Sequence, residues 1–196
     1  KPMLKTSISH FTKYVYNFIK FKEYKKVTLL GNSLGGHISL VFAKEYPKLV
    51  QSLVLTGSSG LYENAMGDSF PRRGDYDYIR KKTEEVFYDP KMATKNLVDH
   101  VFELANKRES IIRLLAMAKS AIRHNMSNDI PKLHFPVCLI WGKQDKVTPP
   151  DVAEEFHNLL PQSDLYWINH CGHSPMWEHP EKFLEILEDW LPKHIK

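Results

Sequence analysis

A pentapeptide with serine at its centre, Gly-Asn-Ser-Leu-Gly at residues 31–35, lies between a short apolar run and a helical pattern. The run Val27–Leu30 predicts a strand, and the apolar residues that recur after Ser33 predict a helix. A serine on so tight a strand-to-helix turn has a strained backbone and needs small neighbours. We expect Gly31 and Gly35 to supply that room. The chain is thus constrained to form a strand, a sharp turn and a helix in this order.

Ser33 is a candidate nucleophile as well as a turn residue. The first N–H groups of a helix have no helical acceptors, so the N–H of Leu34 is placed to bind an oxyanion that forms beside the serine. A chance match to so short a pattern is the alternative, but the flanking strand and helix favour the catalytic interpretation. Asn32 either lines a pocket or simply accepts the strained turn, and the sequence favours neither.

A nucleophilic serine needs a base and an orienting acid, and two later segments offer them. An apolar strand over Val137–Trp141 stops at Gly142, and Asp145 follows on the loop. Another predicted strand, Leu165–Ile168, is followed by His173. Both side chains come just past the carboxyl end of a strand, the edge of a parallel sheet at which sites form. A turn residue without a catalytic role is the alternative for the acid.

Three motifs surround these candidates: GNSLGG (31–36), WGKQDKVTP (141–149) and NHCGHSPMWEHPEKF (169–183). Together they resemble the α/β-hydrolase superfamily, and the resemblance runs nearly end to end. Ser33, Asp145 and His173 follow one another in the order serine, acid, histidine that this fold uses. The resemblance implies an α/β fold with a mostly parallel sheet. It also implies a helical cap inserted after the second strand that this chain contains.

The residues around the candidate nucleophile and the candidate histidine resemble one group within this superfamily more than others. Asn32, the glycine pair at 35–36 and the run Trp177-Glu178-His179 look similar to the meta-cleavage product hydrolases, which cut C–C bonds in dienoate diketones. In those enzymes an aromatic residue directly follows the catalytic histidine, whereas this chain has Ser174. We therefore rank ester substrates above dienoates. Trp177 is a possible pocket residue.

The chain divides into three expected parts: residues 1–60 and 134–196 form the core, and residues 61–133 form the cap. A second strand is predicted over Leu49–Thr56. Between it and the third predicted strand, Val137–Trp141, only helical patterns occur, around 76–87, 91–105 and 109–124. The last of them has one apolar face, made of Ile111, Leu114, Leu115, Ala118 and Ile122. The run Gly57–Gly60 is expected to be a flexible exit from the second strand.

Four strands are predicted, which is fewer than the resembled fold contains. The first half of its sheet is missing, and so is the loop that donates the second oxyanion N–H in the resembled family. We expect a missing N-terminal segment of the same protein to supply both. Without it, the strand before Ser33 would be an open apolar edge.

Composition indicates a globular protein: of 196 residues, 42% are hydrophobic and 26% are charged. The net charge of +4 is spread along the chain, so we expect no nucleic-acid partner, and the absence of a long apolar run argues against a membrane span. Two cysteines provide no disulfide framework, which favours reduced thiols and a cytoplasmic protein. His170 and His173 flank Cys171, but no second cluster has ligand spacing, so we expect neither metal nor cofactor.

The function that these features predict is serine-dependent cleavage of a carboxylic ester or related small acyl substrate through an acyl-enzyme. The alternatives are a C–C hydrolase of the meta-cleavage type, a lyase with the same triad and a non-catalytic small-molecule receptor on a hydrolase scaffold. A homo-oligomer is compatible with the sequence. An arginine that points inward from the cap would favour acidic substrates, and the candidates are Arg72, Arg73, Arg113 and Arg123.

Overall fold

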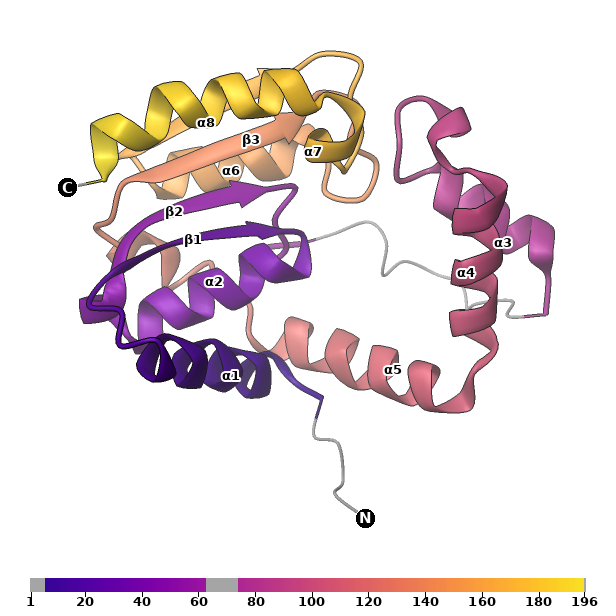
Figure 1. The fold of residues 1–196 in the computed structure, drawn as a ribbon, viewed down its shortest axis with the longest axis horizontal. Coiled ribbons are helices and arrows are strands. Elements are labelled where there is room, and N and C mark those ends of the chain that lie inside the picture. The colour runs from indigo at the N-terminus through magenta and orange to yellow at the C-terminus, as the bar shows by residue number, and fades with distance from the viewer. Residues whose placement is uncertain (1–5, 63–73, 196) are drawn as a thin grey trace.

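The computed structural model describes residues 6–62 and 74–195, and its centre is a four-stranded parallel sheet (Figure 1). The strands follow the chain order and are β1 (Val27–Asn32), β2 (Val50–Thr56), β3 (Val137–Gly142) and β4 (Ser163–Ile168). They confirm the four strands predicted from apolar runs, with β4 beginning two residues earlier than expected. Because all strands are parallel, their carboxyl ends meet at one edge of the sheet.

Helices cover both faces of this sheet (Figure 1). On one face lie α1 (Ile8–Phe21), α2 (Leu34–Glu45) and α6 (Pro150–Leu159), and on the other lie the short α7 (Pro175–Glu178) and α8 (Pro180–His194). The central strand β3 alternates between the two layers. Val137, Leu139 and Trp141 pack into the first, whereas Cys138 and Ile140 pack into the second. Burial on both faces explains why β3 is apolar throughout.

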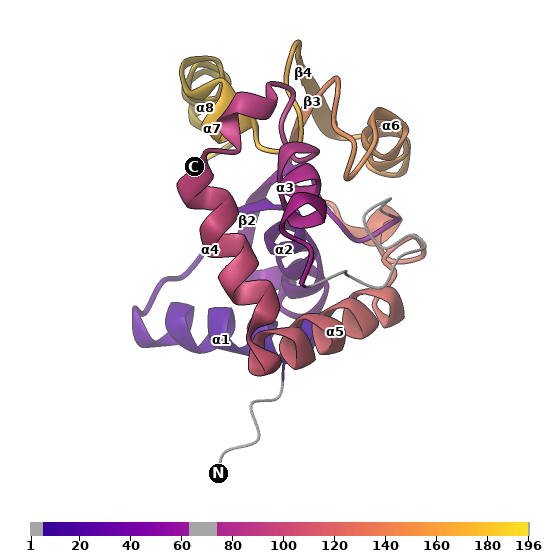
Figure 2. The ribbon, with the colours of Figure 1, turned by 90° about the vertical axis from the view of Figure 1, so that its right-hand side faces the viewer.

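A segment of three helices separates β2 from β3 in the chain. It comprises α3 (Tyr76–Glu84), α4 (Lys95–Asn106) and α5 (Arg108–Arg123), with the 3₁₀ turn η3 (Pro90–Met92) between the first two. We call residues 76–123 the three-helix segment. It stands beyond the carboxyl ends of the strands, and Figure 2 shows it in front of β2 and α2. The three predicted helical stretches are thus confirmed with shifted ends, and further 3₁₀ turns lie at η1 (Pro47–Leu49) and η4 (Ile130–Lys132).

Helix α5 leaves most of the apolar face that the sequence suggested exposed, and the side chain of Ile111 lies outside the described part of the structure. Leu114 and Ile122 are 63% and 67% exposed, whereas Met117 and Ser120 are buried. The neighbouring helix explains this orientation of α5. It packs beside α1, and the Ser120 hydroxyl accepts a hydrogen bond from the N–H of Ile8 at 2.9 Å. Satisfying this first-turn N–H of α1 turns the polar Ser120 inward.

The strand β1 lies at one edge of the described sheet. In the described sheet β1 pairs with β2 alone, and Leu30 on this strand is 51% exposed. No helix within residues 6–62 and 74–195 is long and apolar enough to cross a membrane. The proposed division at residues 60 and 133 stays a prediction.

Candidate active site

The turn between β1 and α2 has the strained backbone that the sequence predicted. Ser33 adopts φ 51° and ψ −118°, a left-handed φ that side chains rarely adopt. Its N–H donates to the carbonyl of Thr56, and its carbonyl accepts from the N–H of Ser59 at 3.1 Å. The end of β2 therefore holds the turn in place. Leu34 is the first residue of α2, and its role in binding an oxyanion stays a prediction.

The glycines of the turn are not equally necessary. A Cβ on Gly31 would collide with the backbone of Gly35, so the expectation for Gly31 is confirmed. A Cβ on Gly35 would meet nothing within 4 Å, so the expectation that this residue supplies room was wrong. The next glycine is the constrained one, because a Cβ on Gly36 would collide with the side chain of Ser58.

Asp145 lies in the acid loop (residues 143–149) and is only 3% exposed. Its Oδ1 accepts hydrogen bonds from the N–H groups of Val147 (2.8 Å) and Thr148 (3.0 Å). Its Oδ2 accepts from the Thr148 hydroxyl (2.9 Å) and faces Nδ1 of His173 at 2.8 Å. Asp145 therefore organises the loop with one oxygen and contacts the histidine with the other, while its catalytic role stays a prediction.

His173 lies in the histidine loop (residues 169–174) and is 5% exposed. A carboxylate only accepts hydrogen bonds, so the 2.8 Å contact with Asp145 assigns a proton to Nδ1, and in the neutral ring Nε2 then carries the lone pair. Nε2 is buried and has no hydrogen-bond partner among the described residues. The structure thus pairs two of the three predicted residues, while the Ser33–His173 hydrogen bond is not formed. Such bonds often form only once substrate is bound.

The backbone of His173 is held from two sides. Its N–H donates to the carbonyl of Val86 in the three-helix segment (2.8 Å), and its carbonyl accepts from the side-chain amide of Asn32 (3.0 Å). The same amide donates to the carbonyl of Thr56 (3.0 Å). Trp177 is 57% exposed and stacks on another aromatic ring. That Asn32 and Trp177 line a pocket stays a prediction.

Two residues near this pair escaped the sequence analysis. Thr148 is fully buried and binds Asp145, and only its place three residues after the acid hinted at it. Gly57 has φ 47°, and a Cβ there would lie 2.8 Å from Nδ1 of His173. The expectation that 57–60 forms a flexible exit was therefore wrong, because all four residues are buried. His173 lies over Gly57, and Leu40 and His37 lie against Gly60.

The acid and histidine loops are joined to each other by backbone contacts. The N–H of Gln144 donates to the carbonyl of Cys171 (2.9 Å), and the side chain of Gln144 accepts from the N–H of Cys171 (3.1 Å). Both cysteines are free and buried. Burial raises the pKa of Cys138 to about 12 and also raises the pKa of Cys171, so both remain thiols at neutral pH. Within the described part of the chain, no three His, Cys, Asp or Glu side chains form a metal-binding group.

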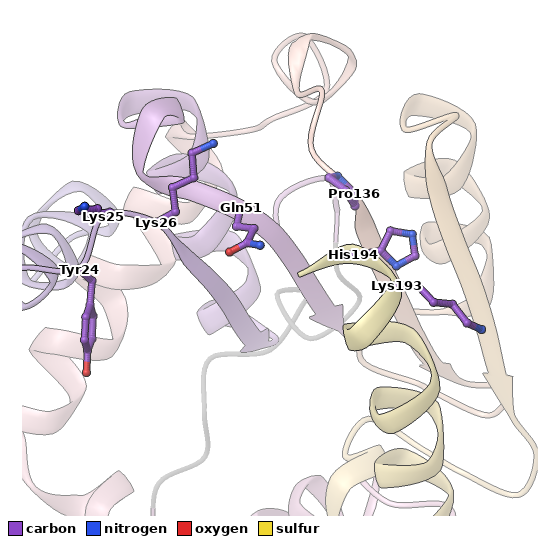
Figure 3. Close-up of a pocket in the computed structure, with 7 residues that line it drawn as sticks. All are labelled: Tyr24, Lys25, Lys26, Gln51, Pro136, Lys193 and His194. Atoms are coloured by element: carbon purple, nitrogen blue, oxygen red, sulfur yellow. The ribbon is translucent and has the colours of Figure 1, made fainter. Parts of the chain in front are cut away.

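Three cavities among the described residues include neither Asp145 nor His173 in their lining. One of about 780 Å³ is found at the amino ends of the strands, and Figure 3 shows the residues that line it. They are Tyr24, Lys25, Lys26, Gln51, Pro136, Lys193 and His194. Three lysines and a histidine make this groove basic, and it contains none of the predicted site residues.

A family model described as the alpha/beta hydrolase fold matches residues 5–180. The chain belongs to this family. The α/β-hydrolase fold accounts for the parallel sheet, the helices on both faces and the position of the serine turn after a strand.

Three relatives of this α/β hydrolase are informative. A 2-hydroxy-6-oxononadienedioate/2-hydroxy-6-oxononatrienedioate hydrolase of Pseudomonas sp. is 28% identical over 86% of this chain and 64% of its own length. A 2-hydroxy-6-oxo-6-(2'-aminophenyl)hexa-2,4-dienoic acid hydrolase of Metapseudomonas resinovorans is 28% identical over 98% and 69%. The crystal structure of MGS-MChE2, an α/β-hydrolase enzyme from the metagenome of lagoon sediments at Mar Chica, Morocco, is 46% identical over 98% and 73%, with a TM-score of 0.78. The chain thus spans slightly less than two thirds of the Pseudomonas enzyme.

Proposed function

We propose that the protein is a serine hydrolase in which Ser33 is the nucleophile, His173 the general base and Asp145 the orienting acid. The observation that carries this proposal is the buried Asp145–His173 pair, whose Nε2 keeps a free lone pair beside the carboxyl ends of the strands. The strained conformation of Ser33 supports it, because strain of this kind is maintained at functional turns.

In the proposed reaction, Ser33 Oγ attacks the substrate carbonyl while Nε2 of His173 takes the hydroxyl proton. Asp145 holds the Nδ1 proton and stabilises the imidazolium that forms. The N–H of Leu34 binds the oxyanion. His173 then passes the proton to the leaving group, and water releases the acyl group from Ser33 by the same steps. This scheme needs a small acyl substrate and no cofactor, and the two buried free thiols are compatible with the proposed cytoplasmic location.

Ester hydrolysis is the first candidate because Ser174, a small residue, follows the histidine where an aromatic was expected for a dienoate pocket. Of the candidate arginines, Arg113 and Arg123 are exposed and so offer no inward cation for an acidic substrate; Arg72 and Arg73 lie outside the described residues. Meta-cleavage C–C hydrolysis is the second candidate, since two of the named relatives carry that activity in their names. There the same groups would first ketonise a dienol and then expel a carbanion equivalent.

Labelling of the whole protein with a fluorophosphonate probe tests the nucleophile. We expect modification at Ser33, its loss in Ser33→Ala, and a turnover decrease of several orders of magnitude. Asp145→Asn should leave the fold intact and reduce kcat by about 10⁴-fold, because it favours the wrong histidine tautomer. Ser127→Ala is the matched control and should label like the parent. Persistent labelling of Ser33→Ala would remove this serine from the mechanism, and stoichiometric binding without turnover would favour the receptor alternative.

The two substrate classes are separated by kcat/KM for short-chain aryl esters and for ring-fission dienoates. We expect the esters to be the better substrates. A preference for the dienoate of more than about 100-fold, or roughly 2.7 kcal/mol of differential transition-state binding, would make C–C hydrolysis the primary function.

A further inference from the structure

Glu178, the last residue of α7, bridges two segments that are far apart in the chain. Its Oε1 accepts a hydrogen bond from the N–H of Gly172 (2.8 Å), and its Oε2 accepts one from the N–H of Tyr88 (2.6 Å). Gly172 directly precedes His173, whereas Tyr88 lies in the connection between α3 and η3. A single carboxylate therefore joins the histidine loop to the three-helix segment.

The connection around Tyr88 also packs directly on the histidine loop. The carbonyl of Val86 accepts the N–H of His173 at 2.8 Å. The rings of Phe87 and Trp177 stack with their centroids 6.1 Å apart and 12° between their planes. A Cβ on Gly172 would lie 2.7 Å from the carbonyl oxygen of Val86, which leaves no space for a side chain between the two backbones. The Glu178 carboxylate thus adds hydrogen bonds to two segments whose backbones already pack closely together.

The two hydrogen bonds of Glu178 are of the stronger kind, because their acceptor is charged. Since both oxygens are used, they fix the relative orientation of the two segments as well as their distance. On the opposite side, the carbonyl of His173 is tied to the core by Asn32. The place of the imidazole therefore depends on the three-helix segment as much as on the sheet.

The geometry points to Glu178 as a positioning residue that couples the three-helix segment to His173. A movement of this segment when substrate binds beneath it would be passed through the carboxylate to the histidine backbone, and so to Nε2. This inference rests on the proposed role of His173 as the base. A role confined to stabilising the four-residue helix α7 would change the melting temperature without changing kcat of the folded enzyme.

Glu178→Gln in the whole protein tests the coupling, with Glu181→Gln as the matched control on an exposed glutamate of α8. A glutamine has one acceptor oxygen, so one of the two N–H groups loses its partner. We would measure kcat and KM on an aryl ester, normalise kcat to the sites titrated by fluorophosphonate, and follow hydrogen exchange of the Tyr88 and Gly172 amides.

We expect kcat of Glu178→Gln to decrease by about tenfold with KM within about threefold, because a misplaced base slows the chemical step more than binding. Exchange at Tyr88 or Gly172 should accelerate by about tenfold or more. Glu181→Gln should match the parent in all three measurements. Unchanged kcat per titrated site, or unchanged exchange at both amides, would overturn the proposal.

A second variant, in the connection between α3 and η3, tests whether its contact with Trp177 acts together with Glu178. Phe87→Leu removes the stacking on Trp177, and we expect its effect on kcat to be non-additive with that of Glu178→Gln in a double-mutant cycle. Additive effects would show that the two contacts act independently and would contradict coupling. Failure of the parent to label at Ser33 would refute the proposed function instead, while the exchange measurement still decides whether Glu178 joins the two segments.

Discussion

The edge of the sheet and the three-helix segment use polar side chains in opposite ways. In the acid and histidine loops, Asp145, Thr148 and His173 are buried and bind one another. In the three-helix segment the ion pairs are local and exposed, and Lys95–Asp99 on α4 is an example. Buried polar groups must be satisfied in one arrangement, whereas exposed pairs between neighbouring turns hold little beyond their own helix. The sheet edge therefore fixes geometry, whereas the three-helix segment contacts it at particular points.

The largest effect is expected from Gly57→Ala, which adds a methyl group next to the Asp145–His173 pair and so tests whether the sheet edge fixes its geometry. In Gly57→Ala the new Cβ would lie 2.8 Å from Nδ1 of His173 on a backbone with φ 47°. We expect kcat/KM to decrease on the order of 100-fold, because the imidazole must move. Gly35→Ala is the matched control, since its Cβ would meet nothing within 4 Å. If both variants lost activity equally, crowding near the nucleophile rather than displacement of the pair would be the cause.

A smaller effect, on the pH dependence of stability, is expected from His37, which contacts the residue that follows α5. The ring of His37 on α2 is buried, and its Nε2 donates to the carbonyl of His124 at 2.8 Å, which leaves Nδ1 as an acceptor without a described partner. Burial lowers the pKa of His37 below 6.5, and the hydrogen bond to His124 opposes this shift only in part. As the pH falls below about 6.5, the unfolded chain binds a proton that the folded chain resists, so stability decreases.

His37→Gln should remove this contribution. We expect its free energy of unfolding to fall less between about pH 7.5 and about pH 5.5 than that of the parent, by up to roughly 1.4 kcal/mol for each unit of pKa shift. Urea unfolding at the two pH values measures the difference. His134→Gln, at an exposed histidine, should behave like the parent, and a pH dependence unchanged by His37→Gln would show that another group carries it.

The smallest effect should come from the surface of the three-helix segment. Lys95→Ala removes the exposed pair with Asp99, and screening by solvent and salt leaves such a pair little net energy. We expect the melting temperature to stay within experimental error and kcat/KM to remain that of the parent. A clear loss of activity would show that α4 contacts the substrate or the core more closely than its exposure indicates.

The strands, and the positions of Asp145 and His173 just past them, could be predicted because each depends on a short stretch of chain; the catalytic roles stay predictions. Val137–Trp141 is apolar because both of its faces are covered, and Asp145 follows it at the loop where a parallel sheet collects functional groups. The errors at Gly35 and Gly57 have another origin. The space at a glycine is set by whichever segment crosses it, and for Gly57 that segment is more than a hundred residues away.

The packing of α5 and the contacts of Glu178 were also missed, because both depend on segments that are distant in the sequence. Periodicity identified an apolar face on α5, but the hydroxyl of Ser120 binds the first turn of α1, and the sequence contains no signal for that pairing. The carboxylate of Glu178 was visible only as part of a motif. Its two partners are backbone N–H groups, which every residue but proline carries and no pattern distinguishes.

The parallel pairing of β2 with β3 has a consequence for the assembly of the sheet. β2 ends at Thr56 and β3 begins at Val137, so the chain between two adjacent strands includes the whole three-helix segment. The entropy of closing such a loop grows only with the logarithm of its length, about 0.6 kcal/mol for each doubling. Pairing over so long a separation slows folding far more than it weakens the folded state. The length of chain between β2 and β3 therefore costs the sheet little closure entropy, and its larger effect is on the time that β3 takes to pair with β2.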